Sequence, residues 1–226
     1  MNCIVTAGPT FEPIDHVRRL TNLSTGRLGT GLADHLAARG HQVCLLLAET
    51  ATGPAPTRAQ SVTRFSTTAD LHAQVARRSG TGVGAVFHAA AVSDFTPAGL
   101  WTQSAGGGFE RLTAGKVPSD ISPLWLELQA TPKIIGHLRS WFPQAVLVGW
   151  KYEVDGTPAQ AVARGRAQIA EYSTSACVVN GPAYGPGYAL VGAAGGAQHW
   201  EGPTPLYSAL AQLIESPSHH GSSNAG

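Results

Sequence analysis

Continuous apolar runs recur along this chain, and segments with helical spacing separate them. HQVCLLLAE at 41–49 is apolar through its centre, which is typical of a parallel strand buried on both faces. Similar runs lie at 3–8, 84–92, 145–153 and 176–180, and helical segments lie at about 27–39, 68–79, 131–142 and 157–172. Strands that alternate with helices of about ten to fifteen residues predict an α/β fold. We expect a Rossmann-like, doubly wound, mostly parallel sheet with helices on both faces.

The 226 residues fit one domain, which we expect to span residues 1–215. Residues 95–123 are rich in Gly, Ser and Pro and show no clear period, so we expect a structureless excursion that serves as a lid or flap. A strand at 124–129 returns from it. A small hairpin at 188–200 and a helix at 205–216 close the domain, and the low-complexity tail at 216–226 is expected to be disordered.

Composition and charge limit the classes of partner that the chain can bind. A net charge of +1, with no basic run between aromatic residues, argues against a nucleic-acid surface. No apolar run approaches the roughly eighteen residues that a membrane span needs, and no leader opens the chain, so we expect a cytoplasmic protein. Cys3, Cys44 and Cys177 lie within apolar runs and are expected to be buried, reduced thiols.

The predicted fold also indicates where a ligand binds. Open α/β sheets bind ligands beyond the carboxyl ends of their strands, where the strand order reverses. The segments of interest are therefore those that follow Gly8, Glu49, Val92, Gly149 and Val179.

A glycine-rich turn, TGRLGTG at 25–31, opens the first predicted helix. Backbone N–H groups at the positive end of a helix suit a phosphate or a carboxylate. Alternatively, Gly26, Gly29 and Gly31 only permit close packing of the helix on the sheet. Both interpretations stay open at this point.

Short-chain dehydrogenase chemistry is excluded by the lysines. That chemistry needs a Tyr-x-x-x-Lys pair, and the chain has lysine only at positions 116, 133 and 151. The tyrosine would have to stand where Leu112, Gln129 and Leu147 stand.

Six segments together decide the interpretation. TAGPTFEPIDHVRRLTNLSTGRLG, from Thr6 to Gly29, follows the pattern TAGxTxEPIDxVRxxTNxSSGKMG. After it come AAAVSDF at 89–95, AGKVPS at 114–119, ATPKII at 130–135, VGWKYE at 148–153 and VVNGPA at 178–183. In this order and spacing, over roughly residues 2 to 215, the chain resembles the phosphopantothenoylcysteine synthetase (phosphopantothenate–cysteine ligase) family, the second half of the bifunctional coenzyme A biosynthetic flavoprotein.

The resemblance implies a ligase with the fold predicted above. Such an enzyme activates the carboxylate of 4′-phosphopantothenate with a nucleoside triphosphate and Mg²⁺, and the amine of cysteine then attacks the acyl-nucleotide intermediate. CTP is expected rather than ATP as the co-substrate, no flavin is expected, and the family suggests a homodimer. Since a carboxylate is a poor electrophile, the enzyme must neutralise phosphate charge and orient two substrates.

The opening motif and the loop lysine contain the catalytic residues that the resemblance implies. Asn22 matches the asparagine that holds the acyl-nucleotide intermediate, Arg18 matches a phosphate-binding arginine, and Lys116 matches the loop lysine that approaches the triphosphate. Ser24, Thr25 and Gly26 are expected to cradle a phosphate at the helix start.

The later segments carry the nucleotide site that the resemblance implies. Asp94 follows a buried strand and is expected to contact ribose or Mg²⁺. Trp150 is expected to stack on the base, although a strand tryptophan more often belongs to the core. The remaining nucleotide-binding residues are Ala90, Ala91, Pro132, Lys133, Ile134, Ile135 and Arg166.

Three departures from the family pattern leave alternatives open. Ala170 stands where the family has a second basic residue, Lys133 replaces an aspartate, and Arg27 replaces a lysine. A divergent acid or amine substrate, a nucleotide- or flavin-binding reductase, and a non-catalytic binding homologue therefore remain as other interpretations. No decarboxylase half precedes the chain, so we expect a monofunctional protein.

Overall fold

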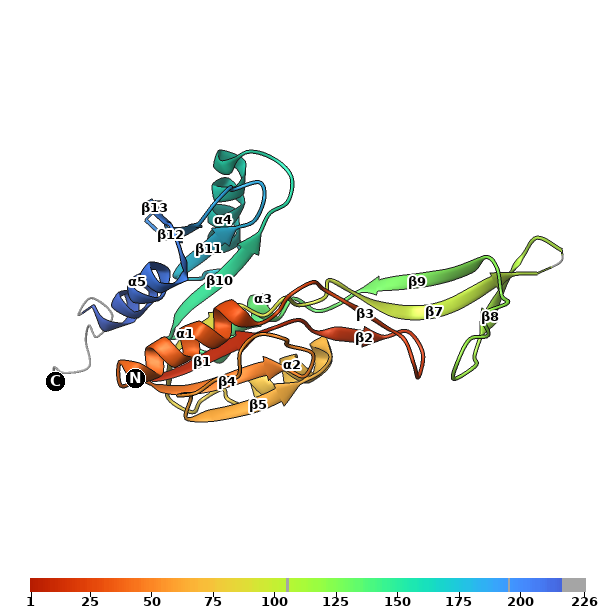
Figure 1. The fold of residues 1–226 in the computed structure, drawn as a ribbon, viewed down its shortest axis with the longest axis horizontal. Coiled ribbons are helices and arrows are strands. Elements are labelled where there is room, and N and C mark those ends of the chain that lie inside the picture. The colour runs from red at the N-terminus through yellow and green to blue at the C-terminus, as the bar shows by residue number, and fades with distance from the viewer. Residues whose placement is uncertain (105, 195, 217–226) are drawn as a thin grey trace.

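The computed structural model describes residues 1–104, 106–194 and 196–216, and within them one large sheet forms the centre (Figure 1). Its eight strands have the order β13-β12-β11-β10-β6-β1-β4-β5. In chain order they are β1 (Asn2–Ala7), β4 (Gln42–Ala48), β5 (Ser61–Phe65), β6 (Val83–His88), β10 (Val146–Tyr152), β11 (Ala176–Asn180), β12 (Tyr188–Gly192) and β13 (Ala197–Trp200).

The pairing confirms the predicted fold class. The strands from β5 to β11 pair in parallel, whereas β12 and β13 add an antiparallel edge. The chain runs outward from β1 through β4 to β5, then returns to β6 on the other side of β1 and continues through β10 to β11. The strand order therefore reverses between β1 and β6, which is where a doubly wound sheet binds its ligand.

Helices cover both faces of the sheet, as predicted. Along β1 the side chains alternate between the faces, so Cys3 and Val5 join a cluster with α1 (Arg27–Ala38) and α5 (Pro203–Glu215). Ile4 points the other way, into a cluster with α2 (Thr68–Ala76) and α3 (Ile134–Trp141). A third cluster packs α4 (Pro158–Tyr172) against β11 and β12. Because both faces are covered, inner strands such as β1, β4 and β11 are largely apolar rather than alternating, whereas the edge strands β5 and β13 are more exposed.

Local contacts and backbone conformation set two of the helix ends. The Thr67 side chain accepts a hydrogen bond from the Asp70 N–H and caps α2. Gly40 follows α1 with a φ of 88°, the left-handed conformation that ends helices. The strand predicted at 84–92 is shorter than expected, because β6 ends at His88. Beyond it, the Ala91 N–H donates to the Gly8 carbonyl and the Thr10 N–H donates to the Ala91 carbonyl, so a parallel bridge keeps this turn beside the chain that follows β1.

The prediction of a structureless excursion at 95–123 is wrong. This segment contains β7 (Phe95–Gln103) and β8 (Phe109–Leu112), which form an antiparallel sheet of order β8-β7-β9 with β9 (Leu124–Ala130). We call residues 95–130 the flap; it extends far from the central sheet (Figure 1). Most of its side chains are exposed or half-buried, so no hydrophobic alternation marks its strands, and a bulge between Pro97 and Gly99 breaks the pattern further.

A second element that the sequence analysis missed lies beside the base of the flap (Figure 1). β2 (Phe11–Pro13) and β3 (Arg19–Thr21) form a short antiparallel hairpin inside the long segment between β1 and α1. Each strand has three residues, too few for a periodic signal.

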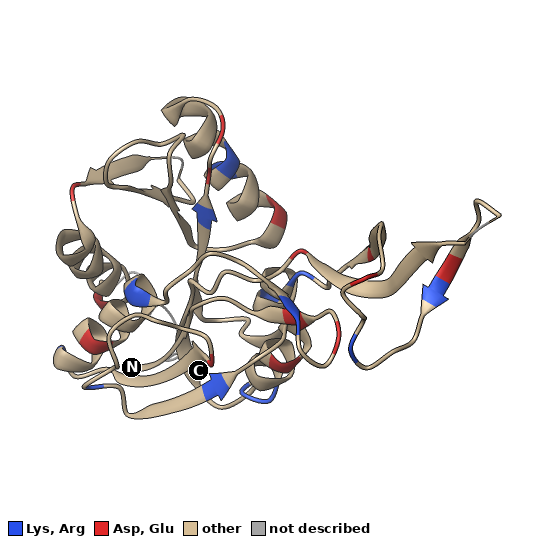
Figure 2. Ribbon diagram, turned by 45° about the vertical axis from the view of Figure 1, so that its right-hand side comes forward, with Lys and Arg blue, Asp and Glu red and all other residues tan. Residues whose placement is uncertain are grey.

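Charged residues of both signs are interspersed over the central domain and the flap (Figure 2). No helix among the described residues has the length and apolar character needed to cross a membrane. Of the tail at 216–226, all but Ser216 lies outside the described residues.

Substitution of Gly29 tests the contact between α1 and β1. A Cβ at Gly29 would lie 2.6 Å from the Ala7 Cβ and 3.1 Å from the Thr6 carbonyl oxygen, so α1 would have to move off the sheet. We expect Gly29→Ala to lower the free energy of unfolding by about 1–3 kcal/mol in urea denaturation. The matched control is Gly136→Ala in α3, where a Cβ would meet Tyr172 at an ordinary 3.6 Å. The control should gain about 0.5–1 kcal/mol, since alanine is the better helix former; equal effects would contradict the packing argument.

An ion-pair cluster that joins the carboxyl ends of α1 and α5 predicts a pH dependence. The Glu215 carboxylate accepts from Arg39 Nε at 2.9 Å and Nη2 at 2.6 Å, and lies 3.0 Å from His41 Nε2. The Arg39 hydrogen bonds lower the pKa of Glu215 from 4.5 to about 2. Because the folded carboxyl has the lower pKa, its contribution is complete above pH 4.5 and is lost as the pH falls towards 2.

The test compares Glu215→Gln with the wild-type chain by urea denaturation at several pH values. We expect the variant to be less stable at neutral pH and the difference to shrink as the pH falls from about 4.5 to about 2. Glu49→Gln, on an exposed side chain, is the control and should show no such trend. A difference for Glu215→Gln that stays constant with pH would argue against the cluster.

Candidate active site

A cavity of about 930 Å³ lies beyond the carboxyl ends of β6, β10 and β11, beside the point where the strand order reverses. Three segments that are far apart in the sequence form most of its wall: the end of the hairpin with the start of α1, the turn after β6, and the last residues of β10. The lining residues are Thr21, Asn22, Leu23, Ser24, Thr25, Gly26, Arg27, Leu28, Gly29, Ala89, Ala90, Ala91, Val92, Asp94, Trp150, Lys151, Tyr152, Glu153 and Asn180.

Asn22 joins two of these segments. It directly follows β3, and its Nδ2 donates to the Ala91 carbonyl oxygen at 3.2 Å. The turn after β6 is itself fixed to the sheet, since the Ala90 N–H donates to Thr6 Oγ1 and the Ala91 N–H donates to the Gly8 carbonyl. The Asn22 amide is exposed at the cavity wall, where it can still bind a ligand.

Ser24, Thr25 and Gly26 lie at the start of α1, as predicted from the sequence. Gly26 is the N-cap residue with a φ of 76°, a conformation that favours glycine, and it offers no side chain to the first N–H groups of the helix. Since Leu28 and Gly29 also line the cavity, the positive end of the helix faces it.

The structure supports the packing interpretation for two of the three glycines, and phosphate binding at the helix start stays a prediction. Gly29 and Gly31 serve packing: a Cβ at Gly31 would lie 2.6 Å from the Tyr207 hydroxyl, and Gly29 lies against Ala7. Gly26 alone combines the left-handed conformation with a place in the cavity wall.

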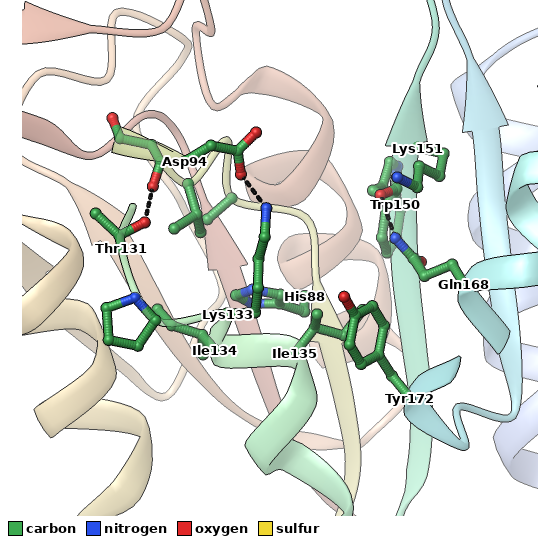
Figure 3. Close-up of a pocket in the computed structure, with 14 residues that line it drawn as sticks. His88, Asp94, Thr131, Lys133, Ile134, Ile135, Trp150, Lys151, Gln168 and Tyr172 are labelled. Atoms are coloured by element: carbon green, nitrogen blue, oxygen red, sulfur yellow. Dashed lines mark hydrogen bonds and ion pairs between the residues drawn. The ribbon is translucent and has the colours of Figure 1, made fainter. Parts of the chain in front are cut away.

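A narrower cavity of about 190 Å³ adjoins the first (Figure 3). The two share Ala90, Val92, Asp94, Trp150 and Lys151 as lining residues, so they form one continuous cleft. Four predicted nucleotide-binding residues line its far side: Pro132, Lys133, Ile134 and Ile135.

Asp94 forms an ion pair with Lys133, which begins α3 and reaches towards it across the cleft (Figure 3). The Asp94 carbonyl also accepts from the Thr131 N–H at 3.0 Å. Among the described residues, no group of three or more His, Cys, Asp or Glu side chains forms a metal site. A single carboxylate nevertheless fits Mg²⁺ that is held chiefly by substrate phosphates.

Trp150 belongs both to the core and to the cleft. It packs against the cluster between β1 and α1 and lines both cavities, and its Nε1 is buried without a hydrogen-bond partner in the described structure. Gln168 of α4 donates to the Trp150 carbonyl at 3.2 Å and fixes the strand beside it (Figure 3).

Lys151 and His88 line the cleft but were not predicted as site residues. Lys151 lies two positions after Gly149, at a strand end that the fold rule had marked, so this signal was available. His88 gave no separate signal, because it stands within an apolar strand. Burial lowers the pKa of His88 to about 4, so the imidazole is neutral at pH 7, and its Nδ1 lies 3.0 Å from Thr6 Oγ1.

Arg18 and Lys116 come together at another place. Both line a cavity of about 620 Å³ between the hairpin and the flap, apart from the cleft that Asn22 lines. An extended strand rises about 3.3 Å per residue, so β3 separates Arg18 from Asn22 by about 13 Å. Arg166 lies on the exposed face of α4 and lines none of these three cavities.

Comparisons with known proteins agree with this geometry. The model of the DNA/pantothenate metabolism flavoprotein C-terminal domain family matches residues 1–183. The coenzyme A biosynthesis bifunctional protein CoaBC of Thermococcus kodakarensis is 31% identical over 178 residues, which are 78% of this chain and 40% of that protein. The chain thus spans less than half the length of that relative.

Solved structures share the fold over nearly the whole chain. The DNA/pantothenate metabolism flavoprotein of Streptococcus pneumoniae has a TM-score of 0.81 and 26% identity, with 95% of this chain and 98% of that chain covered. A Cab2 variant in complex with phosphopantothenate-cysteine has a TM-score of 0.68, with 95% and 87% covered; at 16% identity this likeness concerns the fold alone.

The opening motif lies at the switch point of the sheet, and the family model covers this motif, the cleft and the flap. This chain therefore belongs to the DNA/pantothenate metabolism flavoprotein C-terminal domain family.

Proposed function

We propose that the chain is a phosphopantothenate–cysteine ligase of coenzyme A biosynthesis. The observation that carries the proposal is the juxtaposition in one cleft of Asn22, the positive end of α1 and the turn after β6. A helix start suits a phosphate, and an amide suits an acyl-nucleotide that offers both carbonyl and phosphoryl oxygens.

In the proposed reaction, the carboxylate of 4′-phosphopantothenate attacks the α-phosphorus of the nucleoside triphosphate, and pyrophosphate leaves. The cysteine amine then attacks the acyl carbon, loses a proton and displaces the nucleoside monophosphate, so that an amide bond forms. The chain supplies no nucleophile of its own. Its contribution is to orient two substrates and to offset negative charge as pyrophosphate departs.

The proposed roles follow from position in the cleft. The start of α1 from Ser24 to Gly26 holds the phosphate of the acid substrate or of the nucleotide. The narrower cavity takes the nucleotide between Trp150 and the start of α3, and Lys151 lies where the two cavities meet. Mg²⁺, when bound with the triphosphate, would offset phosphate charge, and Asp94 would be the carboxylate that holds it.

We further infer that the chain acts as a homodimer. Lys116 lies on the flap side of the hairpin rather than in the cleft with Asn22. The flap also carries exposed large apolar side chains, at Phe95, Phe109, Leu124, Trp125 and Leu128. An exposed apolar surface of this kind suits a protein partner, and a second copy of the chain would cover it. Small molecules are the other partners we propose, with the reaction in the cytoplasm and CTP preferred to ATP.

The reductase alternative has less support. Gly29 and Gly31 lie in close helix packing, so neither is free to approach a dinucleotide phosphate. Of the three glycines, Gly26 is the one with a positive φ in the cavity wall. A non-catalytic homologue would keep the cleft and lose turnover, so only an activity measurement separates it from the ligase.

The decisive assay incubates the chain with 4′-phosphopantothenate, cysteine and Mg²⁺, together with either CTP or ATP, and measures pyrophosphate. We expect release that depends on the acid substrate and is faster with CTP. The absence of release with both nucleotides would refute the ligase. Absorption by the purified chain at about 450 nm, where a bound flavin absorbs, would support the reductase instead.

Asn22→Asp tests the handling of the intermediate. The substitution replaces the donor amide with a carboxylate, which repels the phosphoryl group and loses the hydrogen bond to the Ala91 carbonyl. We expect amide formation to slow about 10²-fold or more, because one oriented donor is removed. Pyrophosphate release should slow less. Single-turnover measurement of both products checks this, and an equal loss in the two steps would contradict the assigned role.

A further inference from the structure

The two carboxylates of the Glu12-Pro13-Ile14-Asp15 segment do not line the cleft. Glu12 is 5% exposed and the Asp15 side chain is 1% exposed, and both belong to the hairpin beside the flap. A buried carboxylate is costly unless hydrogen bonds satisfy it, so the partners of these two groups show what the segment does.

Glu12 fixes the base of the flap. Its Oε1 accepts from the Thr68 N–H at the start of α2 at 2.9 Å, and its Oε2 accepts from Thr96 Oγ1 in β7 at 3.1 Å. One carboxylate therefore joins the central domain to the first strand of the flap.

Asp15 fixes the loop that carries Lys116. Its Oδ1 accepts from the N–H groups of Val17 at 2.9 Å and Arg18 at 2.8 Å, and its Oδ2 accepts from Arg18 Nε at 3.0 Å. The same Oδ2 accepts from the Val117 N–H at 3.3 Å. These hydrogen bonds, led by the one from Val17, lower the pKa of Asp15 to about 2, so the carboxylate is charged at neutral pH.

Further bonds hold both neighbours of Lys116. Arg18 Nη2 forms an ion pair with Asp15 at 2.8 Å and donates to the Val117 carbonyl at 2.6 Å, and the His16 N–H donates to the Gly115 carbonyl at 2.9 Å. The Val117 side chain is buried, at 2% exposure, whereas Lys116 itself is exposed. The loop is thus held on each side of a lysine whose side chain is accessible.

We infer that Asp15 is a positioning residue for Lys116, acting through Arg18 and the backbone of Val117, while Glu12 anchors the flap on which that loop lies. The inference rests on the proposed function, in which Lys116 approaches the triphosphate. It also changes the role of Arg18, whose Nε and Nη2 serve the loop, so that any phosphate contact would use Nη1.

The test compares Asp15→Asn with Lys116→Gln and the wild-type chain in two measurements. Hydrogen exchange without substrates reports whether the loop is held, and pyrophosphate release reports whether Lys116 is placed. Asparagine has one acceptor oxygen where Asp15 has two, so Asp15→Asn should free the loop and speed exchange of the Val117 amide about tenfold or more. The His16 amide, which is bound to the Gly115 carbonyl of the same loop, should follow. Exchange in α1 should stay at the wild-type rate, which shows that the variant is folded.

In the activity arm, Asp15→Asn should lower kcat for pyrophosphate release in the same direction as Lys116→Gln, with little change in KM for the nucleotide. Lys116→Gln should leave exchange of the Val117 amide unchanged. Glu110→Gln, which removes an exposed carboxylate from β8 of the same flap, is the matched control and should change neither measurement. Arg18→Lys keeps the cation but loses the planar fork, and should also speed Val117 exchange.

Unchanged exchange at Val117 in both Asp15→Asn and Arg18→Lys would overturn the inference, as would faster exchange with a normal kcat. A wild-type chain that releases no pyrophosphate would refute the proposed function and, with it, the placement of a catalytic lysine. In that case the exchange rates still decide whether Asp15 holds the loop.

Discussion

The close contact between α1 and β1 is the constraint on which the rest of the site depends. Gly29 lies so close to Ala7 and the Thr6 carbonyl that a Cβ at this position would clash with both. This contact brings the start of α1 to the carboxyl end of β1, next to β6, where the strand order reverses. Only then can Asn22, just before the helix, reach the turn at Ala91.

The segment between β1 and α1 is long because it contacts both the flap and the cleft. A dinucleotide-binding turn passes from strand to helix in a few residues, whereas this chain leaves the sheet, forms a hairpin and returns. The outgoing half carries Glu12 and Asp15, whose carboxylates bind the flap, and the returning half ends at Asn22 in the cleft. One hairpin therefore connects the flap to the cleft through β3, three residues long.

The sequence predicted the central domain well because its signals are local. Buried strands such as 41–49 are apolar through their centre. Thr67 caps the start of α2 and Gly40 follows the end of α1, each within a few residues of the helix. The flap strands and the hairpin could not be found in this way. The hairpin strands are three residues long, too short for a periodic signal, and β9 pairs with β7 from far along the chain. The side chains of the flap are largely exposed, so burial imposes no pattern on its strands.

The sequence predicted which residues belong to the candidate site better than it predicted how they are arranged. Motif likeness named Asn22, Arg18 and Lys116 together, but it contains no distances, and the structure separates Arg18 and Lys116 from Asn22. His88 was missed because a neutral imidazole within an apolar run looks like core. Lys151 was missed although the fold rule pointed to its strand end.

In the proposed two-step ligase reaction, the separation of Lys116 from Asn22 has a chemical consequence. Negative charge is greatest while pyrophosphate departs, and an added cation lowers that barrier only if it is near the phosphates during that step. A lysine on a loop held at both neighbours, on a flap joined to the central domain by Glu12, can be positioned accurately without standing permanently in the cleft. Asn22, by contrast, is bound to the Ala91 carbonyl and lines the cleft itself. At one end of β3, Arg18 thus holds the loop of Lys116, the residue proposed for activation; at the other end, Asn22, the residue proposed for the intermediate, lies in the cleft.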